Sequence, residues 1–363
     1  MSKINNTIDA DPVLSEEQKR ALKILSEKVY TQPVTVLQGY AGTGKSFTIS
    51  KFLEYSLFKR VAFVAYTGTA AKVLSNENPG LETSTIHSLI YKPIRRGDYV
   101  QFVLKSPEEL SHLELIVVDE FSMVDGKMMS QLLSFGKPLI LVGDPFQLPA
   151  FNKTYPNPYL NQVDALLTEV HRQALDNPVL SLATDIRNGA TIKPGIYGKN
   201  GEIYVGKRGD IQDSWYNKDV QFLCGTNATR EAINAKVAKN PKLQIGEKII
   251  FLKNDFESDI TNGTLATVSH FIKGSGNRYV LTGETNNGEP FSKYLAYYQQ
   301  ARTYKDQFFD RAYAITVHKA QGQTIDAPLV IIDESRVFGA DAQRWLYTAV
   351  TRSTGKYKLA ILR

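Results

Sequence analysis

The stretch GYAGTGKS at residues 39–46 has the composition and spacing of a phosphate-binding loop, with a strand-like run before it and helical spacing after it. Glycines let backbone N–H groups turn toward phosphate oxygens, and the start of the following helix adds partial positive charge. Lys45 is expected to reach the β- and γ-phosphates of a nucleoside triphosphate, and Ser46 to ligate Mg²⁺. The predicted ATP-binding residues of this loop are Gly39, Tyr40, Ala41, Gly42, Thr43, Gly44, Lys45 and Ser46.

Two further strand-like runs end in polar residues suited to the same chemistry. In LIVVDEFSM, Asp119 is expected to hold Mg²⁺ directly or through water, and Glu120 to polarise the attacking water. The alternative for this pair is a helix cap at a strand exit. In LVGDPFQLPA, Gln147 is placed to sense the γ-phosphate, while Asp144 suits an ordinary turn.

Three residues elsewhere in the chain complete the candidate ATP site. Gln18 precedes the first strand, where a glutamine is able to pair with an adenine edge; an uninvolved surface glutamine is the alternative. Arg172 in LTEVHRQA and Arg352 in LYTAVTRS are candidates for stabilising charge on the γ-phosphate, or else ordinary surface ion-pair residues. If both arginines reach the γ-phosphate, hydrolysis requires a closed cleft between two domains.

Positioning these residues requires parallel strands whose carboxyl ends share an edge. Two series of short apolar runs, separated by helical spacing, predict two α/β units with doubly wound parallel sheets and a cleft between them. The first series covers 33–39, 60–67, 113–120 and 138–144, and the second covers 220–227, 312–322, 329–334 and 357–362.

Three segments depart from this alternation. Residues 91–105 predict a hairpin that turns at Arg96-Gly97-Asp98 and places Val100 and Phe102 on one face. Residues 244–300 alternate polar and apolar types and predict a small β-barrel inserted into the second unit. The Pro- and Asn-rich stretch 151–162 is predicted to link the two units.

Polar loops at the strand ends contain small donors suited to phosphate oxygens of a nucleic acid. Helix capping is the alternative reading of such threonine-rich loops, although four of them on matching edges make capping alone a strained account. The predicted DNA-contacting residues of these loops are Thr67, Gly68, Thr69, Thr85 and His87 in the first half and Thr226, Asn227, Thr316 and His318 in the second.

Composition limits the possible classes of protein. The chain has 363 residues, enough for two or three domains, and its 43 basic and 37 acidic residues give a net charge of +6, compatible with a nucleic-acid partner. No apolar run reaches the roughly 18 residues of a membrane span, and the polar N-terminus has no signal core. A single cysteine, Cys224, excludes an internal disulfide and a cysteine-based metal site, so a cytoplasmic setting is predicted.

Eight motifs in order resemble the superfamily 1B DNA helicases, in particular the Dda-like and RecD-like members: LSEEQ, GYAGTGKS, TSTIHSL, VVDEFSM, GDPFQLP, LTEVHRQ, TVHKAQGQT and LYTAVTRS. The resemblance implies ATP-dependent 5′-to-3′ movement on single-stranded DNA and duplex unwinding, with ATP and Mg²⁺ as cofactors. It also implies two RecA-like motor domains, the first at 1–89 and 106–152 and the second at 153–243 and 310–363. A β-hairpin pin at 90–105 and an SH3-like insertion at 244–309 complete this division.

The resemblance assigns further roles, residue by residue. Gln18 becomes the adenine reader, Gly322 and Gln323 lie near the ribose, and Pro93 and Phe102 of the pin contact DNA. An aromatic wedge recovers about 1–3 kcal/mol by stacking on a base, comparable with the roughly 1.4 kcal/mol lost per opened step. The alternative is that Phe102 packs on the motor.

The implied partners are single-stranded DNA, a DNA fork and replication or single-strand-binding proteins. A monomer without membrane association is expected, in the host cytoplasm if the chain is phage-encoded. The chain is shorter than Dda-like members, and only 293–309 stands where they carry a long tower that braces the pin. This departure leaves open a translocase that displaces bound proteins with little unwinding. A nucleotide-gated binding module or small-molecule kinase is a third hypothesis.

Overall fold

The computed structural model describes residues 2–96, 99–150, 154–170, 176–240, 242–253, 260, 262–273, 279–286, 288–295 and 308–363. The chain forms two compact units. The first comprises Met1–Tyr66 and Ala70–Asp176, and the second comprises Thr67–Thr69 and Asn177–Arg363. Among the helices of these described ranges, none is both long and apolar enough to cross a bilayer.

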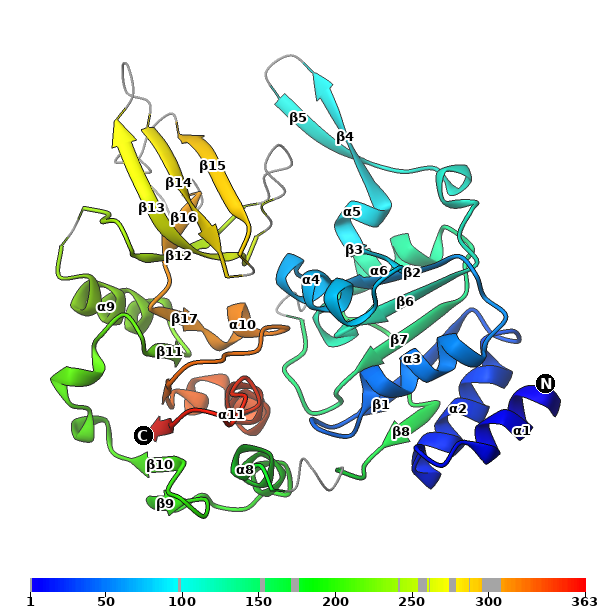
Figure 1. Cartoon of the computed structure of the whole chain (residues 1–363), viewed down its shortest axis with the longest axis horizontal. Helices are drawn as coiled ribbons and strands as arrows, with labels where there is room; N and C mark the ends of the chain where they lie inside the picture. The colour runs from blue at the N-terminus through cyan, green and yellow to red at the C-terminus, as the bar shows by residue number, and fades with distance from the viewer. Residues whose placement is uncertain are drawn as a thin grey trace. The chain divides into compact units, whose positions relative to one another are not determined.

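The first unit is built on a six-stranded sheet in the order β3-β2-β6-β7-β1-β8, in which every pairing is parallel (Figure 1). Its strands end at one common edge, as in other parallel α/β sheets. They are β1 (Val34–Gly39), β2 (Val61–Ala65), β3 (Glu82–Thr85), β6 (Leu115–Asp119), β7 (Leu139–Gly143) and β8 (Ala165–Leu167).

Alternate residues of these strands face two separate apolar layers. Phe63 and Leu37 pack with the helices on one face, whereas Val64 and Val36 pack with those on the other. The first layer contains α1 (Ser2–Ala10), α2 (Glu16–Lys28), α3 (Lys45–Tyr55) and α4 (Gly68–Glu77), and the second contains α5 (Ile86–Ile90) and α6 (Gly126–Leu133). Burial on both faces explains why the strands are almost continuously hydrophobic.

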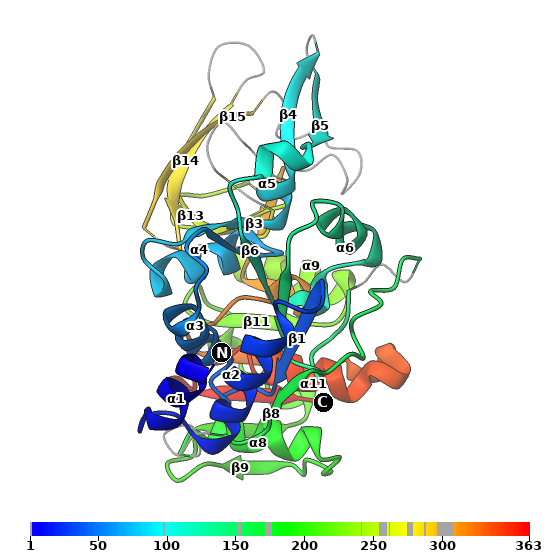
Figure 2. The ribbon, with the colours of Figure 1, turned by 90° about the vertical axis from the view of Figure 1, so that its right-hand side faces the viewer.

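A two-stranded antiparallel ribbon follows α5 and extends away from this sheet (Figures 1 and 2). It consists of β4 (Tyr91–Arg96) and β5 (Tyr99–Leu104), with Pro93 opposite Phe102. Two paired antiparallel strands thus lie within the segment 91–105. Gly97 and Asp98 of the predicted turn lie outside the described residues.

The second unit contains another six-stranded sheet, in the order β17-β11-β18-β19-β10-β9, with parallel pairing except at the antiparallel edge strand β9. Helix α9 covers one face, and α8 packs against α11. The elements are α8 (Pro178–Arg187), β9 (Gly195–Tyr197), β10 (Ile203–Gly206), β11 (Gln221–Cys224), α9 (Asn227–Ala238), β17 (Ala314–Thr316), α10 (Val317–Ala320), β18 (Leu329–Ile332), α11 (Ala342–Val350) and β19 (Leu359–Leu362).

An antiparallel sheet is inserted between α9 and β17 and has its own core around Phe251, Leu281 and Phe291. Its order is β15-β14-β13-β12-β16, and closure of this sheet into the predicted small barrel stays a prediction. Its strands are β12 (Lys248–Phe251), β13 (Leu265–Lys273), β14 (Tyr279–Thr285), β15 (Pro290–Leu295) and β16 (Phe309–Arg311). Short 3₁₀ helices are η1 (Pro107–Leu110), η2 (Phe121–Met123), η3 (Arg208–Asp210), η4 (Asp213–Trp215) and η6 (Ser335–Asp341).

The first unit continues beyond the boundary predicted at residue 152, and residues 154–162 do not behave as a free linker. Asn157 is buried and donates to the carbonyl oxygens of Phe121 and Val124 at 3.4 and 3.0 Å. Strand β8 then pairs with β1, and the N–H groups of Thr168 and Glu169 donate to the Glu17 carboxylate. A buried asparagine and a three-residue strand explain why the Pro- and Asn-rich composition was misleading here.

Candidate functional site

The phosphate loop lies between the end of β1 and the first turn of α3. The Lys45 ammonium group donates to the carbonyl oxygens of Gly39 and Tyr40 at 2.8 and 3.1 Å. Gly44, the residue before α3, has φ of +79°, which glycine adopts without strain, and it supplies no side-chain cap. A Cβ at Gly39 would lie 2.7 Å from Thr43 Oγ1, so a side chain does not fit there. The first-turn N–H groups of α3 are thus left for an anionic ligand.

Side-chain hydroxyls fix the rest of this loop. Thr43 is buried and donates to the Tyr40 carbonyl oxygen at 2.8 Å, and Thr48 donates to that of Gly44 at 2.9 Å. Ser46, the candidate metal ligand, is exposed at the second position of α3. These hydrogen bonds hold the loop backbone in a defined shape, and a preorganised loop lowers the entropic cost of binding a ligand.

Glu120 and Gln147 form a buried polar pair that the fold does not satisfy. Gln147 Nε2 donates to Glu120 Oε1 at 3.3 Å. Glu120 Oε2 and Gln147 Oε1 are both buried without a hydrogen-bond partner among the described residues. Glu120 also has a left-handed backbone, φ 49° and ψ 42°, unusual for a residue with a side chain. Strain and unpaired buried acceptors together are typical of an active site.

Sheet order brings these groups to the edge that carries the phosphate loop. Strand β7 lies between β1 and β6, and all three run parallel, so their carboxyl ends are neighbours. Asp119, half-buried, ends β6 opposite Ala65. Asp144 is confirmed as a turn residue: its Oδ1 accepts from Phe146 N at 2.9 Å, and its carbonyl oxygen accepts from Gln147 N at 3.2 Å. The edge can thus present a carboxylate for metal binding and another for water activation.

Gln18 has a structural role at the start of α2. Its Oε1 accepts from Ser15 N at 3.0 Å, and Ser15 Oγ accepts from Gln18 N at 3.2 Å, which is a reciprocal capping box. The side chain is buried. A carbonyl oxygen can accept a second hydrogen bond, so the contact with adenine stays a prediction.

Arg352 is a buried cation held by neutral groups of the second unit. Only 6% of the residue is exposed; Nε donates to Thr348 O at 3.1 Å and Nη1 to Gln323 O at 3.1 Å. None of the described carboxylates forms an ion pair with it. Gln323 follows Gly322, is buried, and its Oε1 has no hydrogen-bond partner within the described ranges. Arg172 lies outside the described residues.

Three of the four threonine loops do contain helix caps. The hydroxyls of Thr85, Thr226 and Thr316 accept from the N–H groups of Ser88, Thr229 and Lys319 at 3.1, 3.3 and 3.4 Å. Capping thus explains these three threonines without a DNA contact. The remaining predicted residues lie beside helix starts: Thr67 and Gly68 at α4, His87 in α5, Asn227 in α9 and His318 in α10.

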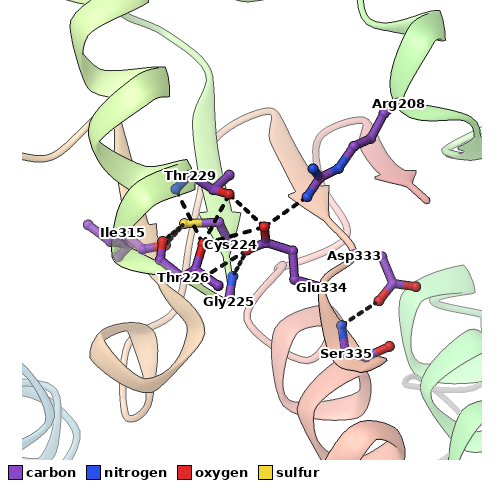
Figure 3. Close-up of polar contacts among 9 residues, drawn as sticks. All are labelled: Arg208, Cys224, Gly225, Thr226, Thr229, Ile315, Asp333, Glu334 and Ser335. Carbon is purple, nitrogen blue, oxygen red and sulfur yellow. Dashed lines mark hydrogen bonds and ion pairs between the residues drawn. The ribbon is translucent and has the colours of Figure 1, made fainter. Parts of the chain in front are cut away.

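Glu334 forms the densest polar cluster around one of these caps, as Figure 3 shows. Its carboxylate accepts from the N–H groups of Gly225 and Thr226 at 2.8 and 2.9 Å, from Thr229 Oγ1 at 2.5 Å and from Arg208 Nη2 at 2.9 Å. Burial alone would raise the pKa of Glu334, but these hydrogen bonds lower it below the ordinary glutamate value. Our sequence analysis missed this residue. The available signal was that LVIIDE repeats the pattern of LIVVDE: both runs end in an acidic pair.

Cys224 lies beside that cluster and is a buried free thiol. Its Sγ donates to the carbonyl oxygens of Thr226 and Ile315 at 3.5 and 3.6 Å (Figure 3). Burial, reinforced by the charge of Glu334, raises the pKa of Cys224 to about 12. The thiol is therefore a packing residue and not a nucleophile.

Aromatic rings connect the hairpin with α5. The His87 ring lies 4.4 Å from that of Tyr91 and 5.3 Å from that of Phe102, measured between centroids. Burial lowers the pKa of His87. Phe102 is half-buried against this pair, whereas Pro93, its cross-strand neighbour, is exposed. The packed alternative for Phe102 is thus observed in this structure. The histidine of the second half, His318, lies 5.4 Å from the Phe338 ring, and burial lowers its pKa.

The chain is similar to known proteins over most of its length. Residues 13–208 match a family model described as an AAA domain, and residues 311–359 match a UvrD-like helicase C-terminal domain. The ATP-dependent RecD2 DNA helicase of Deinococcus radiodurans is 28% identical over 95% of this chain. The ATP-dependent DNA helicase dda of Enterobacteria phage T4 is 27% identical over 95% of this chain. A Bacteroides Pif1 helicase, crystallised with ADP-AlF3 and single-stranded DNA, has a TM-score of 0.61 at 22% identity over 96% of this chain and 92% of its own.

The share of each relative's own length that this chain matches differs between the two helicases. The chain spans 48% of RecD2, about half of it, and 98% of the phage helicase. The AAA-domain match alone covers more than half of the chain and includes the phosphate loop, Glu120 and Gln147. The chain therefore belongs to the superfamily 1B DNA helicases, the ATP-hydrolysing enzymes related to Dda, RecD2 and Pif1.

Proposed function

We propose that this protein hydrolyses ATP to move 5′-to-3′ on single-stranded DNA and to unwind duplex DNA ahead of it. In this proposal, hydrolysis is coupled to closure of a cleft between two RecA-like motor domains. The observation that carries the proposal is the strained, unsatisfied Glu120–Gln147 pair at the same sheet edge as the phosphate loop.

The nucleotide chemistry follows from the residues at that edge. Lys45 binds the β- and γ-phosphates, and the free Glu120 oxygen accepts a proton from the attacking water. Gln147, hydrogen-bonded to Glu120, orients that water and registers the γ-phosphate. Mg²⁺ would be held by Ser46 and Asp119 together with phosphate oxygens. When bound, Mg²⁺ neutralises the charge that develops on the phosphates.

Arg352 supplies the cation from the second motor domain. A guanidinium group that is buried with only neutral partners favours an anion over apolar surroundings. Its acceptors, the carbonyl oxygens of Thr348 and Gln323, orient it without neutralising it. We propose that domain closure brings Arg352 and Arg172 to the γ-phosphate, and that loss of phosphate releases them. Gln18 would read the adenine edge, and Gly322 and Gln323 would lie at the ribose.

The DNA side of the proposal depends on the relatives. RecD2 and the phage T4 relative are named ATP-dependent DNA helicases, and the Pif1 comparison structure contains single-stranded DNA. We assign the polar loops around Thr67, Thr85, Thr226 and Thr316 to the DNA backbone. The hairpin 90–105 serves as the pin, and residues 244–309 as an SH3-like insertion. A cytoplasmic monomer acting at single-stranded DNA and forks completes this assignment.

The experiment is strand displacement on two duplexes that differ only in carrying a 5′ or a 3′ single-stranded tail. With ATP and Mg²⁺, the 5′-tailed duplex should open and the 3′-tailed duplex should not. Lys45→Ala is the control and should leave both duplexes intact. Equal opening of both duplexes, or of the 3′-tailed one alone, would contradict the proposed direction.

Packing of Phe102 on His87 favours one alternative, a translocase that displaces bound proteins with little unwinding. A half-buried aromatic ring is less available to stack on an exposed base than one at a hairpin tip. The discriminating assay is release of streptavidin from a biotin at the 3′ end of an oligonucleotide. Release without strand displacement from the 5′-tailed duplex would support the alternative.

A further inference from the structure

The inserted sheet is connected to α10 through the turn at Asn262 and Gly263, just before β13. The Lys319 ammonium group donates to Asn262 Oδ1 at 2.7 Å. Gln323 Nε2 donates to the Gly263 carbonyl oxygen at 3.3 Å. Gly263 N in turn donates to Phe251 O at 2.8 Å, which ties the turn to β12. The turn therefore follows any movement of the inserted sheet.

Gln323 extends this connection to Arg352. Its side-chain nitrogen also donates to Lys319 O at 2.9 Å, and its carbonyl oxygen accepts from Arg352 Nη1 at 3.1 Å. Arg352 O accepts from Ile325 N at 2.7 Å, so backbone bonds reinforce the side-chain ones. Gln323 and Arg352 are 3% and 6% exposed. A buried hydrogen bond is costly to break when its groups find no replacement partner, so the segment is expected to move as one body.

The same short segment begins with two of the proposed DNA-contacting residues. Thr316 caps α10 by accepting from Lys319 N at 3.4 Å, and His318 precedes Lys319 directly. Burial lowers the pKa of Lys319, and the Arg230 charge adds to this effect. The acceptor oxygen of Asn262 thus stabilises an ammonium group that its surroundings disfavour. Residues 316–323 thus begin with the proposed DNA contacts and end with Gln323, which accepts a hydrogen bond from Arg352. Lys319 and Gln323 of this segment bind the turn at Asn262 and Gly263.

We infer that Asn262 is a positioning residue that couples DNA binding to ATP hydrolysis, acting through Lys319 and Gln323 on Arg352. This inference rests on the proposed function, because Arg352 and the DNA loops have their roles there. Coupling requires an element whose position both sites influence, and the segment 316–323 is that element. Asn262 itself touches neither ligand in this scheme, so its effect should appear in the response to DNA and not in nucleotide binding.

The test is the ATPase rate of the full chain with and without saturating oligo(dT), over a range of ATP concentrations. Asn262→Ala should lower the DNA-stimulated kcat by about three- to tenfold, the range expected for substitutions in a coupling network. Its KM for ATP and its DNA-free rate should stay within about twofold of the original chain. Asn262→Asp keeps the oxygen that accepts from Lys319 and should restore stimulation.

The matched control is Asn286→Ala, which removes the same side chain from the exposed turn that follows β14. It should leave DNA stimulation unchanged. Tryptophan fluorescence of Trp345, buried in the second unit, checks that each variant is folded. If the original chain shows no stimulation by DNA, the proposed function fails. If it is stimulated and Asn262→Ala is stimulated equally, the function stands and the coupling inference is overturned, as it also is if Asn262→Asp matches the alanine variant.

Discussion

Replacement of Glu334 should destabilise the second unit strongly, although the residue lies near its surface. The carboxylate satisfies two backbone N–H groups at the start of α9, the Thr229 hydroxyl and the Arg208 guanidinium. Hydrogen bonds to a charged group contribute about 1.5–3 kcal/mol each. The contributions of these hydrogen bonds do not add fully, because the Arg208 side chain is half exposed and can hydrogen-bond to water when Glu334 is replaced. We expect Glu334→Ala to lower the free energy of unfolding by about 3 kcal/mol, and Glu334→Gln, which keeps the shape without the charge, by about 1.5 kcal/mol.

The assay is urea unfolding followed by tryptophan fluorescence. The chain has two tryptophans, Trp215 and Trp345, and both lie in the second unit, so the signal reports that unit alone. With an m-value of about 2 kcal/mol/M, the alanine variant should unfold at roughly 1.5 M less urea. Glu231→Ala on the same helix is the control: its carboxylate is mostly exposed, so a change within about 0.5 kcal/mol is expected.

The pH dependence gives a second readout. The folded-state pKa of Glu334 is lowered, so its contribution is complete above the unfolded-state pKa of about 4.3 and is lost as pH falls through the folded value. The stability difference between the original chain and Glu334→Gln should therefore be constant at neutral pH and shrink below about pH 4. A difference that does not change with pH, or an alanine variant as stable as the Glu231→Ala control, would refute the reasoning.

Three other substitutions or treatments test the site and its surroundings. Glu120→Gln should lower the ATPase kcat by at least about 10²-fold while ATP binding, measured with a fluorescent analogue, changes little; an unchanged kcat would exclude Glu120 as the base. Phe102→Ala should reduce strand displacement more than DNA-dependent ATPase, and equal losses in both assays would argue against a wedge. Cys224, with its pKa raised to about 12, should not react with Ellman's reagent in the folded chain and should react after the chain is unfolded in urea. Rapid reaction of the folded chain would contradict the burial of this thiol.

The parallel sheets could be predicted because their strands are buried on both faces. Each of the eight apolar runs that we singled out contains a strand. The run that includes Asp119 and Glu120 ends, as predicted, at the carboxyl edge of its sheet. Short strands escaped prediction: β8 is three residues long and its middle residue, Leu166, is exposed, so neither length nor hydrophobicity marks it.

Polar clusters were harder to predict, because their partners are distant in the sequence. The contact between Glu334 and Gly225 spans 109 positions, and that between Gln323 and Gly263 spans 60. The hydroxyls of Thr85, Thr226 and Thr316 cap helices within three residues, and their contact with DNA stays a prediction. Helix capping by a nearby residue has a sequence signature. A carboxylate such as that of Glu334, which follows a different strand, has no signature beyond its residue type.

The left-handed backbone at Glu120 has a consequence for how this protein can be stabilised. A residue with a side chain in that conformation carries about 1–2 kcal/mol of strain, and one buried oxygen of its carboxylate lacks a partner in the described structure. Glu120→Gly would remove both the strain and the unpaired oxygen, and in the proposed mechanism it would also remove the base. Selection of variants for heat tolerance alone would therefore favour loss of the carboxylate to which we assign the activation of water.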